Sequence, residues 1–173
     1  MVDWESIIRT NGAMAFDTAW RLLGHAADTE DAVQEALLEA FQLYARQPIR
    51  NWGGLLRQLA MRRAIDRLRQ RCAVLSLPLE ALTFDPVSPE SEQPESIAVE
   101  RELADRLRLA IAKLPDREAN VFSLHYLGEM ANSEIAETLG ISADAVAVAL
   151  HRARNRLKQL LGLQKDLARR SQS

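Results

Sequence analysis

The chain has 173 residues, 47% of them hydrophobic, and a formal net charge of −2 at pH 7. This length fits one domain or two small ones, and the single cysteine and three scattered histidines predict no disulfide, no metal site and no cofactor. No apolar stretch is long enough to span a membrane, and the first residues, MVDWESII, lack the order of a signal peptide, so we expect a cytoplasmic protein.

The first 72 residues are rich in helix-forming residues and predict a helical bundle. Residues 13–23 place apolar side chains at helical spacing and end at Gly24, which can adopt the left-handed conformation of a helix terminus. Asp28 is the expected cap of the next helix. The apolar stripe of that helix comprises Val33, Ala36, Leu37, Ala40, Phe41 and Tyr44, and the polar residues off the stripe are Asp31, Gln34, Glu35 and Glu39. Trp52 begins a third helix, which carries the arginines Arg57, Arg62, Arg63, Arg67, Arg69 and Arg71.

Residues 73–98 have the composition of an extended acidic linker. They contain five acidic residues and four prolines but no Lys or Arg. Proline removes an amide donor and disfavours a helical conformation in the residue before it. We therefore expect a first domain at residues 1–72, a linker at 73–98, a second helical domain at 99–163 and a C-terminal tail at 164–173. The linker either acts as a solvated spacer or occupies a positively charged groove.

Residues 132–151, NSEIAETLGISADAVAVALH, carry the most informative pattern in the chain. Ile135 and Leu139 lie at helical spacing, Gly140 can form a tight turn, and Ser142 can cap a second helix. These features indicate a helix-turn-helix, whose second helix can lie in the major groove of DNA. The basic side chains that follow could meet phosphates, and they are His151, Arg152, Arg154, Arg156 and Lys158. The alternative is an ordinary helical hairpin with a solvated basic end.

The sequence offers no candidate enzyme site. The three histidines His25, His125 and His151 lie in separate segments, with no plausible nucleophile or metal-binding set beside them. We therefore expect a binding protein rather than an enzyme.

The order of these segments resembles bacterial sigma factors of the extracytoplasmic-function (ECF) group. The segment DTEDAVQEALLEAF resembles the helix of region 2 that binds core RNA polymerase, and RRAIDRLR resembles the end of the promoter-facing helix after it. LPDRE, EIAETLGIS and LHRAR resemble region 4. The resemblance covers about residues 16–161. It implies two small helical domains that bind core RNA polymerase and promoter DNA, an anti-sigma factor as a further partner, and no membrane insertion.

The resemblance also implies three sets of site residues. Core polymerase would contact Asp31, Gln34 and Glu35. The minus-ten element, including an unstacked base, would be bound by Arg46, Arg50, Asn51, Trp52, Arg62, Arg63 and Arg67. The minus-thirty-five element would be bound by Ser142, Asp144, Val148, His151, Arg152, Arg154 and Arg156. Trp52 also fits a position in the core, and Arg154 also fits a residue that braces the fold.

The helix that would read the minus-thirty-five element departs from the family pattern. Ala147, Val148 and Ala149 stand where Lys, Ser and Arg are common, and Ala131 replaces the usual Ser cap of the preceding helix. These changes remove hydrogen-bond donors from the face that would read bases. Two alternatives stand beside the sigma factor: a helix-turn-helix regulator that acts without core polymerase, and a sigma-like interaction protein that no longer reads promoters, which the missing donors favour.

Overall fold

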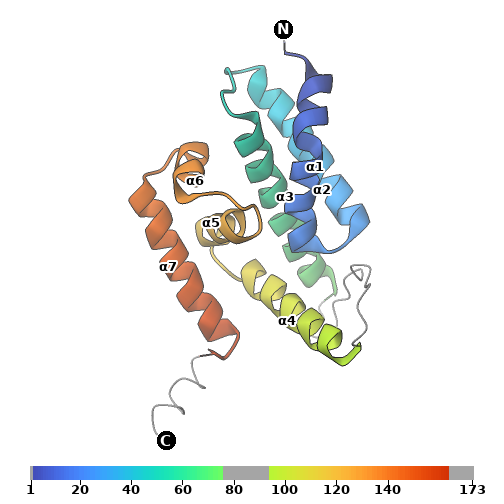
Figure 1. Ribbon diagram of the computed structural model, residues 1–173, viewed down its shortest axis with the longest axis vertical. Helices are drawn as coiled ribbons and strands as arrows, with labels where there is room; N and C mark the ends of the chain where they lie inside the picture. The colour runs from blue at the N-terminus through green and yellow to red at the C-terminus, as the bar shows by residue number, and fades with distance from the viewer. Residues whose placement is uncertain (1, 76–93, 164–173) are drawn as a thin grey trace, which may run out of the picture.

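The computed structural model describes residues 2–75 and 94–163, and every regular element in these ranges is an α-helix (Figure 1). The helices are α1 (Trp4–Leu23), α2 (Ala26–Tyr44), α3 (Trp52–Leu75), α4 (Pro94–Ala112), α5 (Asp116–Tyr126), α6 (Asn132–Leu139) and α7 (Ala143–Leu160). The predicted all-α fold is confirmed for this part of the chain. None of these helices combines the length and the apolar run needed to cross a membrane.

Helices α1, α2 and α3 form the first bundle. Asp3 caps α1 by accepting a hydrogen bond from the amide of Ser6 at 3.2 Å, so this helix begins well before the predicted start at residue 13. Gly24 ends α1 in the left-handed conformation, with φ 54°, as predicted. The cap of α2 differs from the prediction. His25 Nδ1 accepts from the amide of Asp28 at 3.3 Å, so Asp28 lies in the first turn rather than at the cap.

Helices α6 and α7 form the predicted helix-turn-helix. Gly140 ends α6 with φ 64°, and Ser142 Oγ accepts a hydrogen bond from the amide of Ala145 at 3.1 Å at the start of α7. At the start of α6, Ala131 has no side-chain acceptor. The Glu134 carboxylate satisfies the Ala131 amide at 2.8 Å instead.

The helices extend into both ends of the predicted linker. Helix α3 continues to Leu75, and α4 begins at Pro94. Proline is well tolerated at the first helical position, because the amide it lacks would have no partner within the helix there. The rest of the predicted linker and the predicted tail at 164–173 lie outside the described residues.

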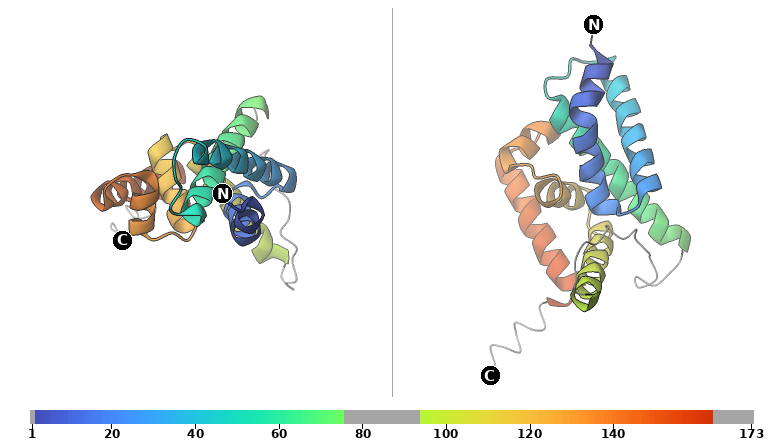
Figure 2. Two further views of the ribbon diagram at one scale, coloured as in Figure 1. Left: turned by 90° about the horizontal axis from the view of Figure 1, so that it is seen from above. Right: turned by 45° about the vertical axis from the view of Figure 1, so that its right-hand side comes forward.

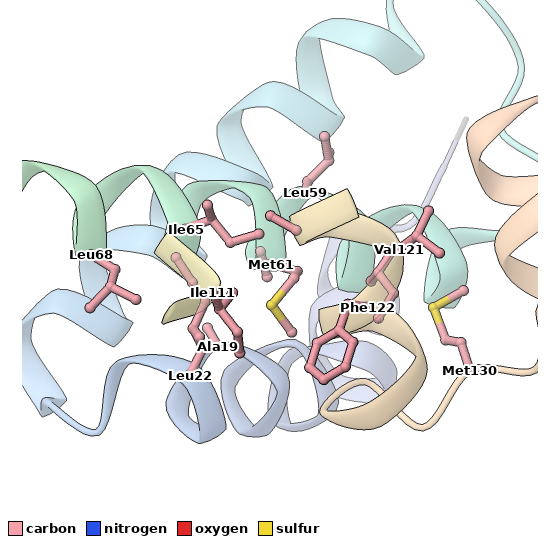
Figure 3. Close-up of a cluster of buried hydrophobic side chains, with 14 of the residues drawn as sticks. Ala19, Leu22, Leu59, Met61, Ile65, Leu68, Ile111, Val121, Phe122 and Met130 are labelled. Carbon is pink, nitrogen blue, oxygen red and sulfur yellow. The ribbon is translucent and has the colours of Figure 1, made fainter. Parts of the chain in front are cut away.

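The bundle of α1–α3 and the group of helices α4–α7 share one hydrophobic core. Helices α5 and α6 lie beside α3 (Figures 1 and 2). Figure 3 shows Met61 and Ile65 of α3 in the same cluster of buried side chains as Ile111 of α4 and Phe122 of α5. Burial of this apolar surface stabilises the contact between α1–α3 and α4–α7.

Candidate functional site

The outer face of α2 carries large apolar side chains in contact with solvent. Leu38 is 65% exposed and Phe41 is 54% exposed. The predicted contact residues Asp31 and Gln34 are also exposed and lie on the same side of the helix at a spacing of three to four residues. Sequence reasoning overlooked Leu38 and placed Phe41 on the apolar stripe of this helix without predicting its exposure. The Phe41 ring packs on the edge of the bundle, 5.2 Å from the ring of Trp4.

Acidic residues of α2 are paired with the arginines of α3 that were predicted to contact DNA. Arg67 bonds to Asp31 at 3.0 Å and also to Glu35. Glu39 accepts from Arg63 at 2.9 Å and also from Arg62. Two of the three predicted polymerase contacts, Asp31 and Glu35, therefore neutralise one of the predicted DNA contacts.

Glu39 is the centre of this network. Burial alone would raise its pKa, but the hydrogen bonds and positive charges of Arg62 and Arg63 outweigh burial and lower the pKa below its usual range. The carboxylate is therefore held in its charged form. Sequence analysis placed Glu39 off the apolar stripe but gave it no role, because nothing local in the sequence indicates two arginine partners from the next helix.

The loop before α3 places the predicted minus-ten residues at its surface. Arg46, Arg50 and Asn51 are exposed. Asn51 Oδ1 accepts a hydrogen bond from the amide of Gly54 at 2.8 Å and so stabilises the start of α3. Trp52 is half-buried, with ring centroids 5.2 Å from Trp4 and 5.8 Å from Tyr44. The side chain of Trp52 therefore belongs to an aromatic cluster at this end of the bundle.

Helix α7 exposes the predicted base-reading face. Ser142, Asp144 and His151 are exposed, and Val148 is 48% exposed. Ala147 is exposed beside them, so the absence of a donor at this position affects the outer surface. Ala149 is buried on the opposite side of the helix, packed in the core. The interpretation of residues 147–149 as one bare recognition surface was therefore wrong for Ala149.

The three arginines at the end of α7 have different surroundings. Arg152 is exposed and forms no ion pair within the described residues. Arg154 Nε donates to the Tyr126 hydroxyl at 2.8 Å, and its guanidinium lies over the Tyr126 ring. Arg156 Nε lies 2.8 Å from the carboxylate of Glu118, whose side chain is 9% exposed. Arg154 and Arg156 therefore brace α7 against α5. Of the three arginines, Arg152 can bind a partner without breaking a contact within the fold.

No group of three or more His, Cys, Asp and Glu side chains in residues 2–75 and 94–163 is arranged to hold a metal ion. Of the three surfaces, one is an acidic and apolar helix face, one is a basic loop and helix, and one is a helix-turn-helix.

Comparison with known proteins identifies the family of both halves of the chain. Residues 7–72 match the sigma-70 region 2 family, and residues 104–157 match the sigma-70 region 4 family. A regulator that acts without core polymerase would not explain the region 2 match, so this alternative gives way.

The chain is similar over most of its length to curated sigma factors. It is 30% identical over 153 residues to the ECF RNA polymerase sigma factor SigW of Bacillus subtilis, covering 84% of this chain and 82% of SigW. It is 27% identical to the ECF sigma factor SigE of Mycolicibacterium smegmatis, covering 93% of this chain but 62% of that longer protein. It is 28% identical to the RNA polymerase sigma-E factor of Streptomyces coelicolor, covering 93% of this chain and 87% of that protein.

A solved structure has the same fold. The sigma factor RpoE of Bartonella quintana, crystallised with the anti-sigma factor NepR, superposes with a TM-score of 0.53 at 18% identity, covering 92% of this chain and 97% of that chain. The chain belongs to the ECF group of sigma-70 factors, which direct promoter-specific transcription initiation by RNA polymerase.

Proposed function

We propose that the outer face of α2 is the principal contact of this sigma factor with core polymerase. The observation that supports the proposal most strongly is the exposure of Leu38 and Phe41 beside Asp31 and Gln34. Exposed apolar side chains with polar neighbours are typical of a protein interface, in which the apolar centre contributes most of the binding energy and the polar rim sets the orientation.

Replacing the apolar residues tests this proposal directly. We expect Leu38→Ala with Phe41→Ala to weaken binding to core polymerase by about 10-fold or more, because buried anchors at an interface commonly contribute at least ~1.4 kcal/mol together. Val99→Ala on α4 is the matched control, since Val99 is 66% exposed on another helix. Titration of labelled variants with core polymerase measures the affinity. Equal affinities for the double variant and the control would contradict the proposal.

Gln34 is the better probe of the polar rim. Gln34 is uncharged, whereas removing Asp31 or Glu35 would also take away one of the two carboxylate partners of Arg67. We therefore expect Gln34→Ala to weaken polymerase binding without a change in the unfolding temperature. The triple replacement of Asp31, Gln34 and Glu35 would lower both, and circular dichroism on heating separates the two effects.

We further propose that the loop residues Arg46, Arg50 and Asn51, with Trp52 behind them, hold the minus-ten strand. Arg62, Arg63 and Arg67 bind the DNA backbone after exchanging their acidic partners for phosphates. Loop variants are then expected to change which base is preferred. Arginine variants are expected to weaken all promoters alike and to reduce the salt dependence. A base preference that changes only with the arginine variants would show that the two roles are reversed.

In region 4, we propose that the bases are faced by Ser142, Asp144, Val148 and His151, and that Arg152 binds a phosphate. Arg154 and Arg156 would reach the backbone only by leaving Tyr126 and Glu118. A helix with so few donors reads bases weakly, so most promoter selectivity would come from region 2. Run-off transcription from a promoter library with reconstituted polymerase tests this proposal, and it also tests the sigma-like interaction protein, which would bind polymerase without producing transcripts.

We also propose an anti-sigma factor as a partner. The support is the similar fold of RpoE from Bartonella quintana, which was crystallised with the anti-sigma factor NepR. A factor that binds core polymerase and promoter DNA acts where both are found, so we place this chain in the cytoplasm. Its role as an initiation factor requires no catalytic residue of its own.

A further inference from the structure

Three aromatic rings from three helices meet at one end of the region 2 bundle. The proposed strand-holding loop, residues 45–51, runs from Tyr44, the last residue of α2, to Trp52, the first residue of α3. Trp4 is the first residue of α1. In Figures 1 and 2 the start of α1 lies at the same end of the bundle as this loop. Both ends of the loop therefore adjoin an aromatic side chain, and α1 brings a third beside them.

Trp4 contacts the aromatic residues at both ends of the loop. Its ring centroid lies 5.2 Å from that of Trp52 and 6.0 Å from that of Tyr44, and the rings are nearly perpendicular in both pairs, at 79° and 80°. The rings of Tyr44 and Trp52 lie 5.8 Å apart. Edge-to-face packing at such distances is favourable, because the positive edge of one ring meets the negative face of the other. The three rings therefore fix the separation of the two ends of the loop.

Hydrogen bonds fix the direction in which the chain leaves each end of the loop. At the α2 end, the amides of Arg46 and Gln47 both donate to the carbonyl of Leu43 at 3.0 Å. At the α3 end, Asn51 Oδ1 accepts from the amide of Gly54 at 2.8 Å. The exposed side chains proposed to meet the minus-ten strand therefore project from a short loop that is held at both ends.

We propose that Trp4 is a positioning residue for recognition of the minus-ten strand, because its ring sets where the two ends of the loop lie. The proposal rests on the minus-ten role of the loop. Recognition of a base depends on donors and acceptors in fixed places, since hydrogen bonds weaken steeply when they are displaced. Attraction between phosphates and the arginines of α3 acts over a longer range and tolerates small displacements. Loss of the Trp4 ring therefore lowers the preference for one base more than it lowers the overall affinity for a strand.

Three substitutions in the full chain separate this role from a structural one. Trp4→Leu keeps an apolar side chain at the end of the bundle but removes the aromatic ring, and Trp4→Phe restores a ring. Trp20→Leu is the matched control, because Trp20 is also half-buried, also lies on α1 and also packs on an aromatic neighbour, Phe16, at 6.2 Å. Trp20 lies about 24 Å further along the helix, away from the loop.

The assay measures capture of single-stranded oligonucleotides by fluorescence anisotropy, with polymerase reconstituted with each variant. One probe is a strand selected from a random pool by polymerase that carries the natural chain, and the other probes replace its most selective base with each alternative. We expect Trp4→Leu to lower the ratio of affinities for the preferred and replaced bases by at least about 5-fold, because a held base commonly contributes a factor of about 5–150 to binding. We expect Trp4→Phe to recover most of this ratio and Trp20→Leu to leave it unchanged. Since each ratio is measured with one complex, a change in polymerase affinity cancels.

Two outcomes would overturn the role of Trp4. One is weaker binding of all probes by Trp4→Leu at an unchanged ratio, and the other is an equal loss of the ratio in Trp20→Leu. Arg50→Ala tests the loop itself. A changed base preference in Arg50→Ala beside an unchanged ratio in Trp4→Leu would refute the positioning role and leave the minus-ten role of the loop intact. An unchanged base preference in Arg50→Ala, or failure of the natural chain and polymerase to select any strand, would overturn the minus-ten role and the positioning role with it.

Discussion

Arg156 pairs with Glu118, and replacing Arg156 distinguishes a role in bracing the fold from a role in binding DNA. The Glu118 side chain is 9% exposed and its carboxylate lies 2.8 Å from Arg156 Nε, while the Arg156 side chain is 55% exposed. Arg156→Ala would leave a largely buried carboxylate without its partner. A buried carboxylate without a partner destabilises a protein by about 1–3 kcal/mol. Because solvent around the exposed arginine screens the pair, we expect a loss of stability of about 1–2 kcal/mol.

The expected result is a fall in Tm of roughly 2–8 °C for Arg156→Ala, because 1 kcal/mol corresponds to ~2–4 °C in a protein of this size. Arg152→Ala is the matched control, since Arg152 is exposed and has no ion-pair partner within the described residues. We expect Arg152→Ala to leave Tm unchanged and to reduce the salt slope of duplex binding by about one phosphate contact. Adding Glu118→Gln to Arg156→Ala should recover part of the lost stability, since the neutral amide is easier to bury.

Thermal unfolding and salt titrations of duplex binding give the two readouts. An Arg156→Ala protein that unfolds at the temperature of the natural chain, but loses as much salt dependence as Arg152→Ala, would refute the bracing role. Arg156 would then be a DNA contact, and its pairing with Glu118 would contribute no net stability.

Two further predictions concern the ion pairs of Glu39 and the two faces of α7. Glu39→Gln should destabilise the protein by about 1–2 kcal/mol at neutral pH. Because the pKa of Glu39 is lowered in the folded protein, this stability difference should persist above the ordinary pKa of 4.5 and disappear as the pH falls through the lowered pKa of the folded state. Urea unfolding at several pH values measures the difference. Ala147→Lys should tighten duplex binding and retain the natural Tm. Ala149→Lys should lower Tm strongly, because it buries an unpaired charge in the core. Tighter duplex binding by both variants would show that α7 presents a different face to DNA.

Features that depend on a few neighbouring residues could be predicted from the sequence. Gly24, Gly140 and Ser142 end and begin helices as expected, because left-handed glycine and a capping hydroxyl act within one turn. The start of α2 was predicted too late because the sequence offers two residues that can cap it. Asp28 could cap a helix that begins after it, but His25 instead accepts a hydrogen bond from the amide of Asp28, and the helix begins at Ala26 at little cost.

Features that depend on pairing between helices could not be predicted in the same way. The acidic face of α2 and the basic face of α3 were both recognised as charged surfaces, but sequence spacing gives no information on whether they face each other. Arg69 is an example, because its partners are backbone carbonyls of a distant turn, which no side-chain pattern indicates. Ala149 is different. Val146, Ala149, Leu150 and Ala153 follow helical spacing, so the burial of Ala149 was present in the pattern.

Helix α3 connects the proposed activities through competition for its side chains. Its arginines Arg62, Arg63 and Arg67 are paired with acids of α2, the helix proposed to bind polymerase, and its Gly54 and Arg69 contact region 4. A DNA phosphate that binds Arg67 must displace Asp31 and Glu35, and those carboxylates then need basic partners from elsewhere. In the proposed contact, basic residues of polymerase on α2 would supply such partners, whereas water alone leaves the exchange close to neutral. Binding of polymerase and binding of promoter DNA should therefore reinforce each other, through exchange of ion pairs that already exist in the free chain.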